Sequence, residues 1–199
     1  LMIIQSKPTS EPAPSNLTYR RILAPVDGSL RAEYGLSTAA HLAREHNAEL
    51  LIAHVIKPPE LPRRTPLSAQ DRSLIQQVVE TNQEEASHYL KSLKAHLDGK
   101  VETCLMVEDS VAEALHALVE ERDIDLTVMN AHGFGGNPRW RFGNMATNFL
   151  AYSTIPLLIV QDFSRNRLAE TKEETNSGEL LVEHHEISTQ DRPVFWENS

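Results

Sequence analysis

The sequence has a single cysteine, Cys104, among its 199 residues. An internal disulfide is therefore excluded, and this cysteine usage fits a reducing compartment. Long apolar runs are absent too, since no stretch approaches the roughly 18 apolar residues that a membrane-spanning helix needs. The apolar run near the N-terminus is about four residues long, which is too short for the core of a signal peptide. We therefore expect a cytoplasmic protein without a membrane span.

Positive charge is scarce as well. The chain has 19 Lys and Arg residues against 28 Asp and Glu residues, which gives a net charge of −9. An acidic chain without a basic stripe is not expected to bind nucleic acid. A phosphate ligand remains compatible with this charge, because backbone N–H groups can hold phosphate without any Lys or Arg.

Several catalytic and metal-binding patterns are missing. The sequence contains no Walker A motif, no G-x-G-x-x-G after its first strand and no G-x-S-x-G turn. His132 has no nucleophile and orienting carboxylate with which to form a triad. His184 and His185 have no cysteine or third histidine at zinc-ligand spacing. We therefore predict no catalytic residue and no metal site.

Short apolar runs alternate with helical patterns along the middle of the chain. Strands are expected at 22–26, 50–56, 101–107, 125–130 and 155–160, and helices are expected around 36–43, 75–97, 114–118 and 146–151. The run at 50–56 is almost entirely apolar, as in a parallel strand covered on both faces. This order predicts a three-layer α/β fold, in which an open sheet of five mainly parallel strands carries helices on both faces in a Rossmann-like arrangement.

The two ends of the chain have a different composition. Residues 1–18 are rich in Pro, Ser and Thr and lack periodicity, so we predict a flexible leader. Residues 19–162 hold the α/β pattern. Residues 163–199 are polar and acidic, and we predict a tail that is either disordered or docks elsewhere.

Three loops have the composition of a ligand site at the carboxyl ends of the strands, where open α/β sheets bind ligands. Asp27 directly follows the first strand and could accept hydrogen bonds from ribose hydroxyls or could cap a helix. Gly133 lies in a glycine-rich segment that allows close backbone approach. Gly143 and Asn144 open the last helix, whose N–H groups suit a phosphate, although Asn144 could equally be a plain N-cap.

Together these segments resemble the universal stress protein family. Residues 25–29 read Pro-Val-Asp-Gly-Ser, which is similar to the end of that family's first strand. Its nucleotide-binding members have Gly, two residues, Gly, nine residues, Gly and then Ser or Thr. Gly133 and Gly143 match this motif, whereas Asn130 replaces its first glycine and Asn144 replaces its Ser or Thr. The resemblance extends over residues 19–162.

The resemblance implies a pocket for ATP or another adenine nucleotide, with or without Mg²⁺. The adenine would contact apolar residues, the ribose would meet Asp27 and Asn130, and backbone groups near the last helix would hold the phosphates. The implied nucleotide-binding residues are Pro25, Val26, Asp27, Val55, Met129, Asn130, Gly133, Gly143, Asn144 and Met145.

Departures from the family motif leave the function open. Asp109 stands where relatives often have glycine, and its carboxylate would repel phosphates. Arg139 and Arg141 could offset that repulsion or could be solvated loop residues. The first interpretation is a stress-response regulatory protein that binds a nucleotide. The alternatives are a nucleotide-independent adapter and, at most, a slow ATP hydrolase.

We also expect a homodimer, because members of the resembled family commonly pair through the last strand. Residues Ile155 to Val160 would be that strand, and an apolar sheet edge tends to find a partner. Pro156 is compatible with an edge position. An additional protein partner of unknown identity is expected for a regulatory protein.

Overall fold

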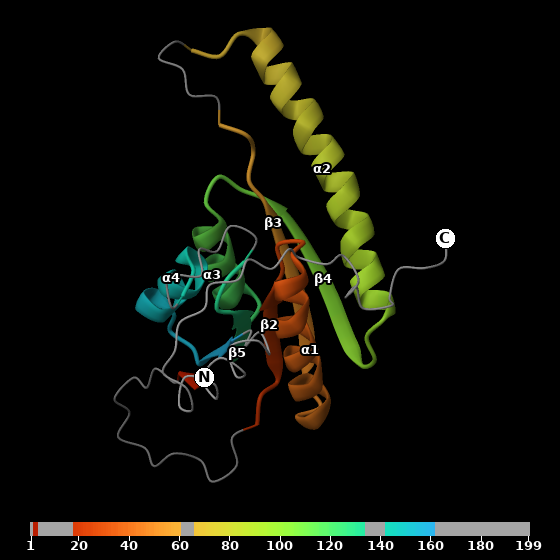
Figure 1. Ribbon diagram of the computed structural model, residues 1–199, viewed down its shortest axis with the longest axis vertical. Coiled ribbons are helices and arrows are strands. Elements are labelled where there is room, and N and C mark those ends of the chain that lie inside the picture. The colour runs from red at the N-terminus through yellow and green to blue at the C-terminus, as the bar shows by residue number, and fades with distance from the viewer. Residues whose placement is uncertain (1, 4–17, 61–65, 134–141, 162–199) are drawn as a thin grey trace, which may run out of the picture. The chain divides into compact units, whose positions relative to one another are not determined.

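The computed structural model describes residues 2–3, 18–60, 66–133 and 142–161. It confirms the predicted α/β fold, with five parallel strands between two helical layers (Figure 1). The chain separates into the units Leu1–Asp162 and Phe163–Ser199. The acidic tail predicted for 163–199 lies outside the described residues and remains a prediction.

The sheet has the strand order β1-β6-β5-β2-β3-β4. Its parallel strands are β2 (Arg21–Pro25), β3 (Glu49–Ile56), β4 (Lys100–Val107), β5 (Leu126–Asn130) and β6 (Leu157–Val160). Because β2 lies between β5 and β3, the strand order reverses beside it. This is where open α/β sheets bind ligands, at the carboxyl ends of the strands.

A sixth, two-residue strand was not predicted. Met2 and Ile3 form β1 and pair antiparallel with β6, with Met2 opposite Leu158 and Ile3 opposite Leu157. Two residues of the predicted flexible leader therefore belong to the sheet, since extended backbone can satisfy the unpaired edge of β6. The last strand starts at Leu157 because Pro156 has no N–H for the ladder, although the Pro156 carbonyl accepts a bond from the N–H of Thr127 at 3.0 Å.

Four helices follow the parallel strands in turn, and three of them begin with a serine cap. They are α1 (Leu30–Glu45), α2 (Ala69–Ala95), α3 (Val111–Glu121) and α4 (Asn144–Tyr152). The Oγ atoms of Ser29, Ser68 and Ser110 accept hydrogen bonds from first-turn N–H groups of α1, α2 and α3. The helix α4 begins after Gly143 and has no side-chain cap.

Alternation along the strands divides the core into two clusters. In β2, Ile22 and Ala24 face the cluster covered by α1 and α2, whereas Leu23 faces the cluster covered by α3 and α4. Leu90 of α2 and Phe149 of α4 are among the buried residues of these two clusters. The central strands are buried on both faces, which explains their almost continuous apolar sequence.

The longest described helix is α2, with 27 residues, and only Ala86 and Leu90 of it are buried. Its N-terminal half extends past the ends of the strands (Figure 1), where Leu74 is 57% exposed. Across the described part of the chain, no helix combines the length and the apolar character needed to cross a membrane.

Candidate functional site

The carboxyl ends of β2, β3 and β5 and the start of α4 meet at one edge of the sheet, which we call the carboxyl edge. Two backbone bonds extend the sheet there. The N–H of Val26 donates to the carbonyl of Ala53 at 2.9 Å, and the N–H of Ala131 donates to the carbonyl of Val160 at 2.9 Å. These bonds continue the pairing of β2 with β3 and of β5 with β6 past the ends of the strands.

Asp27, in the segment after β2, lies close to Gly133, in the segment after β5. Its Oδ1 accepts hydrogen bonds from the backbone N–H of Ser29 at 3.1 Å and from the Ser29 Oγ at 2.6 Å. Ser29, and not Asp27, is the N-cap of α1. Across the gap, a Cβ built at Gly133 would lie 3.3 Å from the Asp27 Cγ and would overlap its Oδ2. Only glycine at position 133 therefore allows this close approach.

Gly143 makes a second close approach. Its N–H donates to the carbonyl of Ala131 at 2.6 Å, and a Cβ there would lie 3.3 Å from the same oxygen. Gly143 is also the N-cap of α4, and the structure contains no side-chain hydrogen bond at this cap. Asn144 is the first residue of the helix and is exposed. The first-turn N–H groups of α4 therefore point to a position where an anion could accept from them.

Asn130 ends β5 and turns its side chain to the opposite side of the sheet. A Cβ built at Gly35 of α1 would lie 2.5 Å from the Asn130 Oδ1. Both the Oδ1 and the Nδ2 of Asn130 are buried without a hydrogen-bond partner. The amide thus lies between β5 and α1, on the face of the sheet away from Met129 and α4.

The chain matches the family model described as the universal stress protein family over residues 18–161. This chain belongs to the universal stress protein family. Universal stress protein YxiE of Bacillus subtilis is 27% identical over 149 residues, which cover 72% of this chain and 99% of that protein.

Solved structures share this fold. The structure of the protein MJ0577 has a TM-score of 0.65 and 22% identity, and the match covers 74% of this chain and 99% of that one. A universal stress protein in complex with cAMP has a TM-score of 0.50 and 22% identity, with coverage of 73% of this chain and 98% of that one.

The structure brings part of the expected nucleotide-binding set of this universal stress protein onto one face. Val55 and Met145 are partly buried against the same core cluster as Met129, which is 5% exposed. Val26 is also 5% exposed but belongs to the cluster on the other face. Pro25 ends β2 opposite Ala53. Of the three residues expected to contact the adenine, Val55 and Met129 therefore lie on one face of the sheet, whereas the Val26 side chain lies on the other.

Three polar side chains behind Asp27 were not anticipated. The Nδ1 of His54 lies 2.9 Å from the Val26 carbonyl oxygen, and the Tyr89 hydroxyl donates to the Glu33 Oε1 at 3.4 Å. The His54 and Tyr89 rings meet edge to face at 6.3 Å. Burial raises the pKa of Tyr89, and the carboxylates of Glu33 and Asp27 raise it further. The sequence offered one signal for these contacts. His54 lies within the apolar run of residues 50–56, where a polar side chain needs a hydrogen-bond partner.

Asp109 lies at the carboxyl edge, after β4, and is exposed. It faces Lys57, whose Nζ is 2.6 Å from the Glu60 Oε1. The hydrogen bond and charge of Glu60 raise the pKa of Lys57, and Asp109 adds a smaller contribution. The carboxylate of Asp109 is therefore exposed at this edge, in the neighbourhood of Lys57. Arg139 and Arg141 lie outside the described residues.

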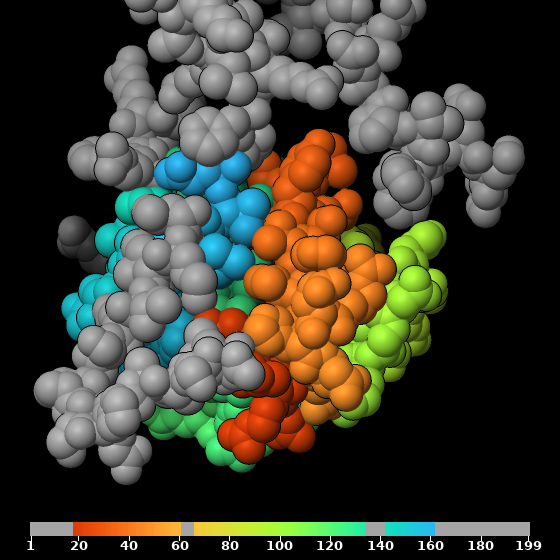
Figure 2. Space-filling model, turned by 90° about the horizontal axis from the view of Figure 1, so that it is seen from below, coloured from red at the N-terminus to blue at the C-terminus, as the bar shows by residue number. Residues whose placement is uncertain are grey.

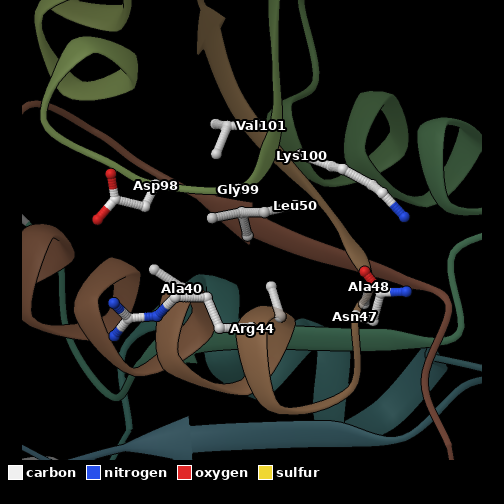
Figure 3. Close-up of a pocket in the computed structure, with 10 residues that line it drawn as sticks. Ala40, Arg44, Asn47, Ala48, Leu50, Asp98, Gly99, Lys100 and Val101 are labelled. Atoms are coloured by element: carbon white, nitrogen blue, oxygen red, sulfur yellow. The ribbon is translucent and has the colours of Figure 1, made fainter.

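A hollow of about 290 Å³ lies at the other end of α1, at the amino ends of the strands. Leu50 and Val101 form its floor, with Arg44 and Asp98 on one side (Figure 3). Figure 2 looks onto this edge, where the orange end of α1 and start of β3 lie between the red start of β2 and the yellow-green start of β4. The hollow is lined by none of the predicted nucleotide-binding residues.

Proposed function

We propose that this chain is a regulatory universal stress protein that binds an adenine nucleotide at the carboxyl edge. The observation that carries the proposal is the convergence of Asp27, the Gly133 turn and the uncapped start of α4. Backbone N–H groups and a helix dipole favour a phosphate at such a helix start. A solved relative of the same fold, in complex with cAMP, supports the same ligand class.

Each part of the site would contact a different part of the nucleotide. The first-turn N–H groups after Gly143, those of Asn144 and Met145 among them, would donate to phosphate oxygens. Asp27 would accept from a ribose hydroxyl, since its Oδ2 lies beside the Gly133 turn. Met129 and Val55 would contact the base. Of Asn130, only the backbone would meet the ribose, because its amide is turned toward Gly35.

The ligand can be ATP or another adenine nucleotide, and magnesium would reach the site with the phosphates. Among the described residues, no three His, Cys, Asp or Glu side chains are grouped to hold a metal ion. In this proposal the chain's own residues bind and orient the nucleotide, and no catalytic step is included. With Cys104 as a free thiol, we place this activity in the cytoplasm.

The test is calorimetric titration of the full chain with AMP. Asp27→Asn keeps the size of the side chain but removes a charged acceptor, so we expect affinity to fall about tenfold or more. Asp98→Asn, at the amino edge, is the matched control and should bind as the natural chain does. Absence of binding by the natural chain at millimolar AMP would refute the proposal.

A nucleotide-independent adapter is the second candidate. It is favoured by Asn144, which stands where the family motif has a hydroxyl, and by the exposed carboxylate of Asp109. On this hypothesis the variant Asn130→Gly/Asn144→Ser binds AMP and the natural chain does not. Equal binding by both chains would remove the reason for the adapter hypothesis.

The expected homodimer would form through β6 and the residues before it, Ile155 to Val160. In the structure, Met2 and Ile3 pair with Leu158 and Leu157 on that edge. A second copy would therefore have to replace β1 in order to add its own strand there. A protein partner of the regulatory function could use the same edge.

A further inference from the structure

The side chain of His54 makes a hydrogen bond to the residue that precedes Asp27. His54 belongs to β3 and lies on the face of the sheet under α1 and α2, as Ile52 does, whereas Ala53 lies on the other face. Its Nδ1 is 2.9 Å from the carbonyl oxygen of Val26. Since a carbonyl oxygen can only accept, the Nδ1 carries the proton and donates it.

The carbonyl that accepts this bond belongs to the peptide group between Val26 and Asp27. Strand β2 ends at Pro25, and the N–H of Val26 still donates to the Ala53 carbonyl at 2.9 Å. Because a peptide group is planar, the direction of the Val26 carbonyl also fixes the direction of the next N–H and the position of the Asp27 Cα. His54 therefore holds the last peptide group before the carboxylate that would accept from the ribose.

The Asp27 carboxylate has a second contact, at the start of α1. Its Oδ1 accepts from the N–H and the Oγ of Ser29 at 3.1 Å and 2.6 Å. Gly28 lies between the two residues with a φ of 79°, and glycine allows many backbone conformations. The contact with Ser29 therefore does not by itself fix this turn relative to the sheet. The bond from His54 joins the other end of the turn to β3.

The His54 ring is itself fixed by packing against α2. The rings of His54 and Tyr89 meet edge to face, with their centroids 6.3 Å apart. The Tyr89 hydroxyl donates to the Glu33 Oε1 of α1 at 3.4 Å. His54 is thus half-buried beside a side chain that has its own partner. A side chain held in this way can position a neighbouring group accurately.

We propose that His54 is a positioning residue for the nucleotide site, and that its Nδ1–H orients the Asp27 carboxylate through the Val26 carbonyl. The inference rests on the proposed nucleotide site and names a residue that acts on it through another residue. The His54 side chain lies on the opposite face of the sheet from Met129 and Val55, so it does not contact the base.

The test is calorimetric titration of the full chain and three His54 variants with AMP. His54→Leu and His54→Phe have no donor, and the second keeps a ring against Tyr89. Both should lose affinity about threefold to tenfold, which corresponds to the loss of one hydrogen bond. His54→Asn has an Nδ2 donor bonded to Cγ, as the Nδ1 of histidine is, and should bind AMP within about twofold of the natural chain.

Urea unfolding of the same variants separates positioning from a general loss of stability. His54→Asn should be destabilised at least as much as His54→Leu, because it also loses the ring contact with Tyr89 and buries less apolar surface. A merely structural role would then weaken AMP binding by His54→Asn too, whereas positioning predicts that its affinity recovers while its stability does not. His88→Leu, which changes an exposed histidine of α2, is the control and should leave the affinity unchanged.

A double-mutant cycle tests whether His54 acts through Asp27. In an Asp27→Asn background, His54→Leu should reduce the remaining affinity about twofold or less, because the charged acceptor that it positions is gone. An equal loss in both backgrounds would overturn the inference.

Two further results would overturn this inference and leave the nucleotide site intact. One is AMP binding by His54→Leu and His54→Phe that is as tight as binding by the natural chain. The other is binding by His54→Asn that is as weak as binding by His54→Leu. Absence of AMP binding by the natural chain would overturn both the nucleotide site and the role of His54.

Discussion

Gly35 and Asn130 form a matched pair across the boundary between α1 and the sheet. The Asn130 side chain occupies the space that a Cβ of residue 35 would need, with 2.5 Å between the built Cβ and the Oδ1. Glycine inside a helix normally costs about 0.5–1 kcal/mol relative to alanine. Its presence within α1 is therefore explained by the larger side chain that β5 places opposite.

The pair predicts an unusual double-mutant cycle. Gly35→Ala alone should destabilise the protein by about 1–3 kcal/mol, because the methyl group overlaps a buried amide that has little room to move. In an Asn130→Gly background the same change should be neutral or stabilising, since the overlap is gone and alanine has a higher helix propensity than glycine. The measurement is urea unfolding of the four chains.

Ser37→Ala, an exposed change in the same helix, is the control for a general effect on α1. Its effect on the free energy of unfolding should be the same in both backgrounds. A stabilising effect of Gly35→Ala alone would show that Asn130 moves away freely, and the pair would then not be coupled.

The role of Asn130 shows how far a motif can be interpreted without a structure. The apolar pattern of 125–130 correctly indicated that Asn130 ends β5, but the family motif did not indicate where its side chain points. Strand periodicity supplies that direction, because Val128 and Asn130 lie on one face and Met129 lies on the other. A side chain that replaces a motif glycine at this position therefore enters the α1 layer. The glycine-rich segment indicated a close backbone approach at Gly133, but the partners of Gly133 and Gly143, Asp27 and the Ala131 carbonyl, could not be predicted, since they depend on how separate loops meet.

At the scale of elements, the long regular segments were predictable and the short one was not. Parallel strands buried on both faces produce continuous apolar runs, which is why residues 50–56 could be assigned to β3. The serine at position 68 and Asp71 form a capping box that fixes the start of α2. The strand β1 has two residues, too few for any periodicity, and it is recognisable only from its pairing with β6.

The pairing of β1 with β6 predicts a competition at this edge. Removal of residues 1–17 should expose the backbone of Leu157 and Leu158 and should lower the concentration at which two copies associate. The measurement is light scattering of the full and the shortened chain over a series of concentrations. The same association constant for both chains would show that β1 does not occupy the edge through which copies pair.

At the scale of the whole molecule, the two faces of the sheet contribute differently to the proposed site and to stability. The face under α3 and α4 supplies Met129, Val55 and the start of α4, which together form the base and phosphate sides of the proposed site. The face under α1 and α2 supplies packing, and there His54, Tyr89 and Glu33 support the segment around Asp27. Changes on the second face, His54 excepted, should therefore affect stability before they affect ligand binding.

Tyr89 allows this division to be tested by pH. Burial and the neighbouring carboxylates raise its pKa in the folded protein above the usual value near 10. The folded chain therefore keeps this proton when the unfolded chain has lost it. The resulting stability is complete below about pH 10 and declines as the pH rises from there through the folded pKa.

Tyr89→Phe removes the titrating group, so the free energy of unfolding of this variant should fall less steeply with pH above about pH 10 than that of the natural chain. Urea unfolding at intervals from about pH 8 to about pH 11 measures the two slopes. Tyr34→Phe is the matched control, because Tyr34 is 62% exposed. The free energy of unfolding of this variant should fall with pH as steeply as that of the natural chain. Affinity for AMP at neutral pH should be nearly unchanged in Tyr89→Phe, since the hydroxyl contacts Glu33 and not the proposed ligand. If the alkaline slopes of Tyr89→Phe and the natural chain coincide, the buried hydroxyl does not couple folding to pH.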